Sequence, residues 1–237
     1  MQRNRPKTFA DSIRLPLAGG SVTRLITSGG DIPVVTIRVG RASGGTLTIA
    51  AASRLGIREG AAWTGELRAA VLAELARQKG AEYALRIAAA RPLTRRQVQD
   101  KLVQRGMTFD AARAIAEDLA LRGVIDEKSL AEHVASGAMG RPRMGKSVVV
   151  MKLRRRGVDA KTAQRAADQA EADSGVDPRE VAMELARRRV RTLPKGLDAR
   201  GAQRRVYAFL ARRGFDPETC MAAAKQALQG RSADDIE

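Results

Sequence analysis

Aromatic residues, cysteine and histidine are scarce in this chain. Only 3% of its 237 residues are aromatic, and it contains one cysteine, one histidine and one tryptophan. A single cysteine, Cys220, excludes an internal disulfide framework, and we expect it to be a buried thiol. His133 is the single histidine, and no spacing of possible ligands in the sequence supports a metal site. The sequence therefore predicts helices packed through small aliphatic side chains, with no metal and no cofactor.

Long apolar runs and catalytic signatures are also missing. There is no run of 18 apolar residues and no apolar secretory segment, so we expect no membrane contact and a place in the reducing cytoplasm. No Ser-His-Asp set, catalytic carboxylate pair or dinucleotide fingerprint emerges, so we expect a protein that is not an enzyme.

Acidic residues are few relative to basic ones. The chain has 43 Lys and Arg against 26 Asp and Glu, which gives a formal net charge of +17. Such an excess of positive charge gives information about the binding partners of a protein and not about its fold. It indicates nucleic acid or an acidic protein surface.

One stretch formally fits the phosphate-loop pattern G-x-x-x-x-G-K-[ST]. It begins at Gly140 and ends with Gly145, Lys146 and Ser147. A genuine loop of this kind follows a buried strand, whereas the preceding AEHVASGAM has helical character. We interpret the match as coincidental: Gly145 begins a helix, Lys146 contacts solvent or phosphate, and Ser147 lies near the cap.

What the chain does contain is an amphipathic helix that recurs and ends at a glycine. In each copy a leucine lies four residues before a glycine, and an apolar residue follows that glycine. The copies are Leu102–Gly106–Met107, Leu153–Gly157–Val158 and Leu210–Gly214–Phe215. Glycine suits the left-handed position that ends a helix. The leucines are 51 and 57 residues apart, a spacing of the size expected for a helical repeat.

The predicted fold class is mainly α, with tandem three-helix repeats in an elongated array preceded by a small β-hairpin plus helix module. The hairpin is expected between Ile32 and Ile49, covered by a helix over about 64–78 with Trp63 as a core anchor, and a separate helix is expected from about 82. The predicted segments are a flexible basic arm (1–31), the hairpin and helix module (32–79), three helical repeats (80–124, 125–175 and 176–229) and an acidic tail (230–237).

Three stretches resemble the RecX family of bacterial recombination regulators. They are RPLTRRQVQDKL from Arg91, GVIDEKSLAEHV from Gly123 and RPRMGKSVVVMKLRRRGV from Arg141, and the resemblance covers about residues 32–228. The chain departs from the family pattern at Thr94 and Gln97, where the family usually has serine and glutamate. It departs again after Ile125, where DEKSL replaces a pattern with two aspartates and an Arg-Phe pair.

The resemblance implies that the chain binds the RecA recombinase filament on single-stranded DNA and lies in its helical groove. There it would suppress strand exchange, ATP turnover and filament extension. Its partners would be the RecA filament and single-stranded DNA, reached directly or through the filament, and we expect it to act as a monomer. A helical-repeat DNA-binding protein that acts independently of RecA remains the alternative.

Arginine recurs at corresponding places before the three glycines, which suggests a ridge of guanidinium groups along the repeats. Guanidinium suits contacts with carboxylate and phosphate alike, although a charge run is often only a solvated face. The candidate partner- and DNA-binding residues are Arg95, Arg96, Lys101, Arg105, Arg141, Arg143, Lys146, Lys152, Arg154, Arg155, Arg156, Arg187, Arg188, Arg189, Arg204, Arg205, Arg212 and Arg213.

Overall fold

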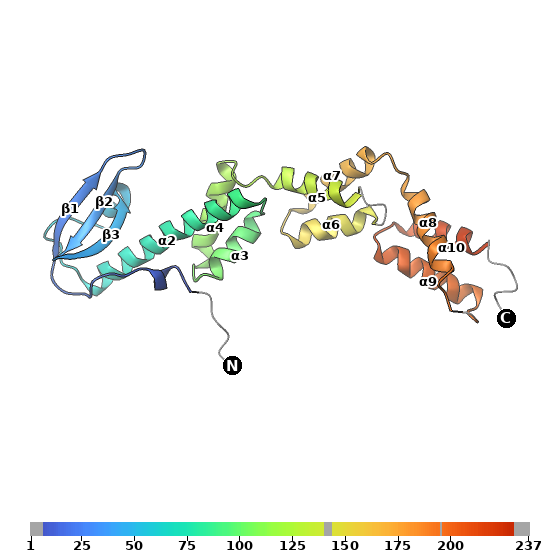
Figure 1. The fold of residues 1–237 in the computed structure, drawn as a ribbon, viewed down its shortest axis with the longest axis horizontal. Coiled ribbons are helices and arrows are strands. Elements are labelled where there is room, and N and C mark those ends of the chain that lie inside the picture. Colours follow the sequence, from blue (N-terminus) through green and yellow to red (C-terminus); the bar gives the residue numbers. More distant parts are fainter. Residues whose placement is uncertain (1–6, 140–143, 195, 230–237) are drawn as a thin grey trace. The chain divides into compact units, whose positions relative to one another are not determined.

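The computed structural model describes residues 7–139, 144–194 and 196–229. The candidates Arg141 and Arg143, the first glycine of the phosphate-loop pattern and the predicted acidic tail lie outside the described residues. The chain divides into two compact units, residues 1–125 and residues 126–237 (Figure 1). The fold is mainly helical with one small sheet near the N-terminus, which confirms the predicted fold class.

The sheet has three antiparallel strands in the order β1-β2-β3, one more than the predicted hairpin. Strands β2 (Val34–Val39) and β3 (Ala42–Thr48) form that hairpin, and β1 (Val22–Ser28) pairs along β2. Residues 22–28 were predicted to belong to a flexible arm, and for them this prediction is wrong. The physical reason is that VTRLITS is rich in β-branched residues and that a two-stranded hairpin is only marginally stable in water.

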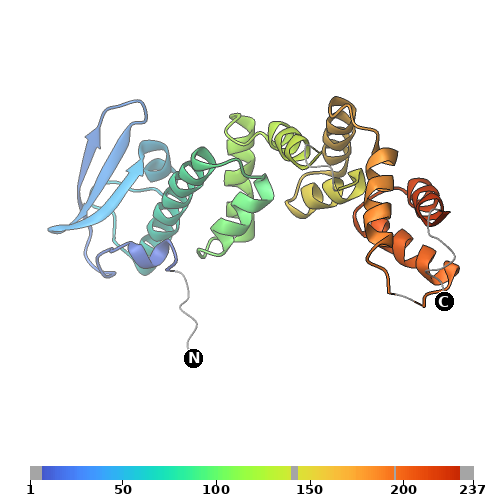
Figure 2. The ribbon, with the colours of Figure 1, turned by 45° about the vertical axis from the view of Figure 1, so that its right-hand side comes forward.

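Helices α1 (Ile49–Arg54) and α2 (Gly65–Ala90) contribute with the sheet to one core (Figures 1 and 2). Trp63 is only 1% exposed in this core, which confirms its predicted role as an anchor. Its indole Nε1 donates a hydrogen bond to the carbonyl oxygen of Pro16 at 3.3 Å. The segment before β1 is therefore tied to the module.

Helix α2 is continuous over 26 residues, although two helices separated near residue 80 were predicted. Gly80 lies inside the helix and is buried, and a Cβ placed on it would lie 2.5 Å from Sδ of Met107. The glycine thus permits close packing between α2 and a segment distant in sequence. This tertiary contact compensates the low helix propensity of glycine.

The helices form three sets, each with its own apolar core. The first set is the C-terminal half of α2 with α3 (Arg95–Val103) and α4 (Phe109–Leu121); the second is α5 (Glu127–Met139), α6 (Lys146–Arg155) and α7 (Ala160–Asp173); the third is α8 (Pro178–Val190), α9 (Ala199–Arg212) and α10 (Pro217–Gln229). The predicted capping box at α3 is confirmed, since Thr94 and Gln97 exchange two hydrogen bonds of 3.1 Å.

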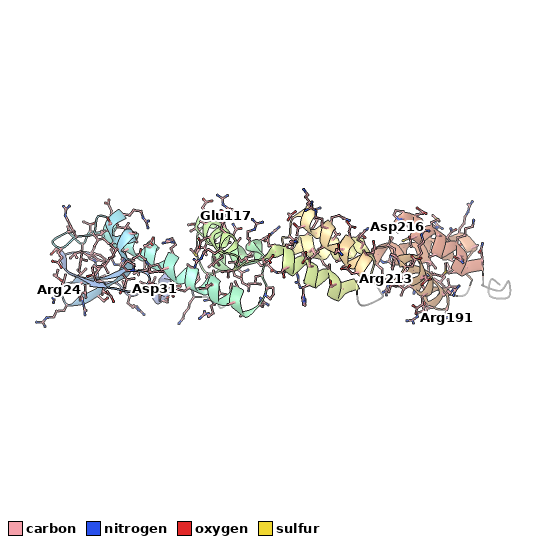
Figure 3. The ribbon with its side chains drawn as sticks, turned by 90° about the horizontal axis from the view of Figure 1, so that it is seen from above. Arg24, Asp31, Glu117, Arg191, Arg213 and Asp216 are labelled. Carbon is pink, nitrogen blue, oxygen red and sulfur yellow. The ribbon has the colours of Figure 1, made fainter. Side chains whose placement is uncertain are left out.

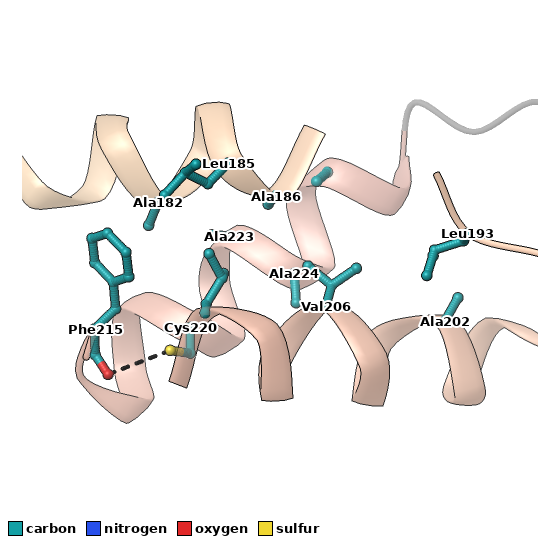
Figure 4. Packing of buried hydrophobic residues seen from close by; sticks show 12 residues of the cluster. Ala182, Leu185, Ala186, Leu193, Ala202, Val206, Phe215, Cys220, Ala223 and Ala224 are labelled. Atoms are coloured by element: carbon teal, nitrogen blue, oxygen red, sulfur yellow. Dashed lines mark hydrogen bonds between the residues drawn. The ribbon is translucent and has the colours of Figure 1, made fainter. Parts of the chain in front are cut away.

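Small side chains dominate the core of the third set (Figure 4). Ala182 and Ala186 on α8 meet Ala223 and Ala224 on α10 in this core, and all four are at most 2% exposed. The thiol of Cys220 is buried beside them and donates a weak hydrogen bond to the carbonyl oxygen of Phe215 at 3.5 Å. Burial raises the pKa of this thiol, so Cys220 is a structural residue, as predicted.

The three repeated glycines end their helices as the sequence predicted. The φ angles of Gly106, Gly157 and Gly214 are +86°, +96° and +91°. We call each of these helix ends a glycine corner. In each one, the N–H of the residue after the glycine donates to the carbonyl oxygen of the leucine that lies four residues before the glycine, at 3.2, 3.1 and 3.4 Å respectively. These bonds satisfy carbonyls that the end of a helix would otherwise leave unpaired.

Candidate partner-binding surface

Two of the glycine corners are docking points within the protein itself. In the first set, the N–H of Phe9 donates to the carbonyl oxygen of Arg105 at 3.1 Å. In the third set, the N–H of Gly145 donates to the carbonyl oxygen of Arg213 at 2.7 Å. The same carbonyl, one residue before the glycine, is therefore used in both sets.

The contact at Gly214 joins the second and third sets. Both the N–H and the hydroxyl of Ser147 donate to the carbonyl oxygen of Gly214, at 3.2 and 2.9 Å. A Cβ on Gly214 would lie 2.6 Å from the backbone nitrogen of Val148, so the two backbones approach closely because residue 214 is glycine. The start of α6 therefore packs directly against the end of α9.

These contacts support the interpretation of the phosphate-loop pattern as coincidental. Among the described residues, the element before Gly145 is the helix α5 and not a strand, and α6 begins at Lys146. The ammonium group of Lys146 lies 3.0 Å from Oδ1 of Asp168 and 3.1 Å from Oε2 of Glu171. These hydrogen bonds raise the pKa of Lys146. The Lys146 side chain, which was predicted to contact solvent or a phosphate, is 38% exposed and also pairs with these two carboxylates of α7.

The arginines at two of the repeated positions stack on aromatic rings of their own sets. The guanidinium carbon of Arg105 lies 4.2 Å from the ring centroid of Tyr83 and 5.9 Å from that of Phe9. The guanidinium carbon of Arg213 lies 4.5 Å from the centroid of Phe209. Arg213 directly precedes Gly214, and Asp216 lies two residues after it. Both side chains are labelled in Figure 3. Both arginines therefore have a packing role that the predicted guanidinium ridge did not include.

The sequence could have indicated one of these two stacks. Phe209 and Arg213 are four residues apart at the end of α9, a spacing that places two side chains on one helix face. The stack of Arg105 on Tyr83 joins residues from α2 and the end of α3. No local pattern signals a contact of that kind.

Most of the remaining candidates are solvent-exposed. The exposed ones are Arg95, Arg96, Lys152, Arg154, Arg155, Arg156, Arg187, Arg188, Arg204, Arg205 and Arg212, and the partly buried ones are Lys101, Arg105, Lys146, Arg189 and Arg213. Arg188 is ion-paired with Glu184 on the same helix. The structure brings four candidates together around one hollow of about 590 Å³ in the third set: Arg189 from α8 and Arg204, Arg205 and Arg212 from α9.

The helices of the described residues include none that combines the length and apolar character needed to cross a membrane. Among the same residues, no group of three or more His, Cys, Asp or Glu side chains is placed to hold a metal ion.

Comparison with known proteins gives a consistent result. Residues 177–223, from α8 into α10, match the family model described as RecX, third three-helix domain. Regulatory protein RecX of Mycobacterium leprae is 30% identical over 138 residues, which cover 57% of this chain and 77% of the relative. Regulatory protein RecX of Corynebacterium efficiens is 34% identical over 148 residues, 61% of this chain and 69% of the relative.

The fold agrees as well. A crystal structure of regulatory protein RecX superposes with a TM-score of 0.62 over 86% of this chain and 97% of the other, at 17% sequence identity. That likeness shows a shared fold, and the sequence relatives show the family. The chain belongs to the RecX family of regulatory proteins.

Proposed function

We propose that the chain regulates recombination by binding the filament that the RecA recombinase forms on single-stranded DNA. It would lie in the helical groove of the filament and suppress strand exchange, ATP turnover and filament extension. Membership of the RecX family carries this proposal, because the relatives are named regulatory proteins. The net charge of +17 supports it, since a filament loaded with DNA offers both phosphates and acidic side chains.

We propose the three helical repeats, residues 80–124, 125–175 and 176–229, as the binding units. Once one unit is docked on a protomer of the filament, the next binds intramolecularly at a high effective concentration. The contact of Gly145 with Arg213 supports this scheme for the second and third units, because it holds them together before binding. Exposed arginines such as Arg96, Arg155 and Arg187 would meet the filament.

Co-sedimentation with the filament tests the proposal. RecA is assembled on long single-stranded DNA with a slowly hydrolysed ATP analogue, and the amount of this chain in the pellet is measured. We expect the chain to sediment with the filament at concentrations at which it leaves naked DNA of the same length in the supernatant.

A charge-matched pair of variants sharpens this measurement. R96Q/R155Q/R187Q removes three exposed cations from the helical sets, and R24Q/R41Q/R58Q removes three from the sheet module. The first variant should sediment less with the filament than the second. Equal sedimentation of the unmodified chain with naked DNA and with the filament would favour the alternative, a DNA-binding protein that acts independently of RecA.

A further inference from the structure

Residues 7–16 form a segment that lies against α2, and we call it the N-terminal strap (Figures 1 and 2). Its first anchor is Phe9, the one buried side chain of residues 7–16, which lies in the core of the first helical set. The rings of Phe9 and Tyr83 pack with centroids 5.7 Å apart, and the N–H of Phe9 donates to the carbonyl oxygen of Arg105 at 3.1 Å. One end of the strap is therefore fastened to the first set.

The other end of the strap is fastened to the sheet module. The carbonyl oxygen of Pro16 accepts a hydrogen bond from Nε of Arg68 at 2.9 Å, in addition to the indole hydrogen bond described above. Arg68 lies in the first turn of α2. Between the two anchors, Nζ of Lys79 donates to Oγ of Ser12 at 3.1 Å. The strap is therefore tied to the side chains of α2 at several points along the helix.

Gly80 lies in α2 between the anchors of the strap, which contact the helix at Arg68 on one side of the glycine and at Tyr83 on the other. Glycine has a low helix propensity, and helices bend at such residues. The helix also passes from one apolar core to another here, since Val71 belongs to the core of the sheet module and Ala84 to the core of the first set. A bend at Gly80 would therefore move the sheet module relative to the first set.

The strap has little slack. The chain from Phe9 to Pro16 reaches at most about 25 Å when it is fully extended. The short 3-10 helix Ala10–Ser12 reduces this reach, because such a helix rises only about 2 Å per residue. Along α2, the rise from Arg68 to Tyr83 is about 22 Å. A bend of α2 that separates these two residues therefore has to break an anchor of the strap.

The strap is built to open as one unit. Apart from Phe9, its side chains are exposed or only partly buried, and segments with few buried apolar contacts open at a lower free energy than the rest of a fold. Leu17, which follows the strap, is 83% exposed. Beyond it, the backbones of Gly19 and Gly20 are bonded to the backbone of Trp63 at 2.8 and 3.0 Å. The strap can therefore swing out from Leu17 while the sheet module stays intact.

We propose that the N-terminal strap is a releasable lock on α2. When the strap is docked, it holds the helix straight at Gly80 and fixes the direction in which the sheet module projects from the first helical set. When the strap is released, Gly80 becomes a hinge between the two, since a hinge needs only a few residues that absorb the change in backbone angles. This inference concerns the chain alone and does not depend on the proposed action on RecA.

A distance measurement between two spin labels tests the lock in the full chain. The labels are attached through R24C in β1 and E117C in α4, two exposed positions that Figure 3 labels, and C220A removes the native thiol. Double electron–electron resonance should give one narrow distance distribution for this reference protein. Addition of F9A should give a broader distribution with a second population at a shifted distance, because the lost anchor frees α2 to bend.

A second variant loosens the strap without emptying a core. Insertion of Gly-Ser-Gly between Arg14 and Leu15 leaves every anchor in place and supplies the slack that the strap lacks. It should broaden the distance distribution in the same direction as F9A. Circular dichroism of each variant verifies that the helices are intact.

F215A is the matched control, because Phe215 is 7% exposed, as Phe9 is, but lies in the other compact unit. Its distance distribution should be as narrow as that of the reference protein. G80A tests the position of the hinge, since alanine favours the helix and its Cβ would meet Sδ of Met107, which belongs to a flexible side chain. The combination F9A/G80A should restore the narrow distribution.

Three results would overturn the proposal. The first is a distribution that stays narrow in F9A or in the insertion variant, which would show that the strap does not hold α2. The second is equal broadening in F215A, which would make the effect a general consequence of losing a buried ring. The third is broadening that persists in F9A/G80A, which would place the motion away from Gly80.

Discussion

Substitution of Gly214 by alanine tests whether the second and third helical sets are joined through the glycine corner. Gly214 has a φ of +91°, which costs an alanine about 1–2 kcal/mol in backbone strain. The added Cβ would also lie 2.6 Å from the nitrogen of Val148 and 2.9 Å from the carbonyl oxygen of Gly145, both backbone atoms. Forcing such overpacking costs about 1–3 kcal/mol more, so we expect a total loss of about 2–5 kcal/mol.

Gly175 provides the matched control within the same compact unit. It follows the end of α7 with a φ of +62°, and no described heavy atom outside its chain neighbours lies within 4 Å of an added Cβ. Gly175→Ala should therefore cost only the backbone strain, about 1–2 kcal/mol.

Urea denaturation followed by circular dichroism gives the free energy of unfolding of each variant. G214A should lose about 1–3 kcal/mol more than G175A, and this excess isolates the contact between the two sets. Equal losses in the two variants would refute the close backbone approach at Gly214 as a stabilising junction.

Two further predictions concern titratable side chains. Glu74 is only 9% exposed, and its Oε2 lies 3.0 Å from Nε of Arg77 and 3.4 Å from Nη2 of Arg54. The hydrogen bond from Arg77 lowers the pKa of the Glu74 carboxyl from its ordinary 4.5. The ionised carboxylate therefore stabilises the fold fully above pH 4.5, and this stabilisation is lost as the pH falls through the lowered pKa. Glu74→Gln should lower the free energy of unfolding, measured by urea titration, by about 1–2 kcal/mol at pH 7 and by progressively less in acid. A difference that stays constant with pH would contradict this. Cys220 has a buried thiol whose pKa is raised, so iodoacetamide should label it at the rate of unfolding, and urea should accelerate the labelling; rapid stoichiometric labelling of the native chain would contradict its burial.

Local signals in the sequence predicted much of the helical framework. The capping box at Thr94 and Gln97 needs residues only three apart, and it forms as predicted. The corner glycines at 106, 157 and 214 were predictable because a left-handed backbone position strongly favours glycine, whichever side chains surround it.

The errors arise where a contact distant in sequence decides the local structure. Gly80 resembles a helix break, yet the helix continues because Met107 packs against the glycine. Strand β1 is flanked by paired glycines that are typical of a flexible arm, although VTRLITS itself is rich in β-branched residues, and it becomes a strand by pairing with β2. The glycines near both segments were therefore given too much weight.

The candidate surface was only partly predictable for the same reason. The spacing of Arg204, Arg205 and Arg212 places them on one face of a helix, and this can be read from the sequence. Arg189 of α8 lines the same hollow of about 590 Å³ only because α8 packs against α9, and the sequence does not show this contact. Nothing in the sequence separated Lys146 and Arg105 from the other candidate binding residues. In the folded protein, however, Lys146 pairs with Asp168 and Glu171, and Arg105 stacks on Tyr83.

The most direct test of the proposed function is the rate of ATP turnover by RecA on single-stranded DNA, titrated with this chain. We expect turnover to fall at concentrations of the chain that leave naked DNA unbound, and we expect that adding more DNA does not restore it. If turnover is unchanged until the DNA itself is coated, or if additional DNA restores it fully, the proposed action on the filament is contradicted.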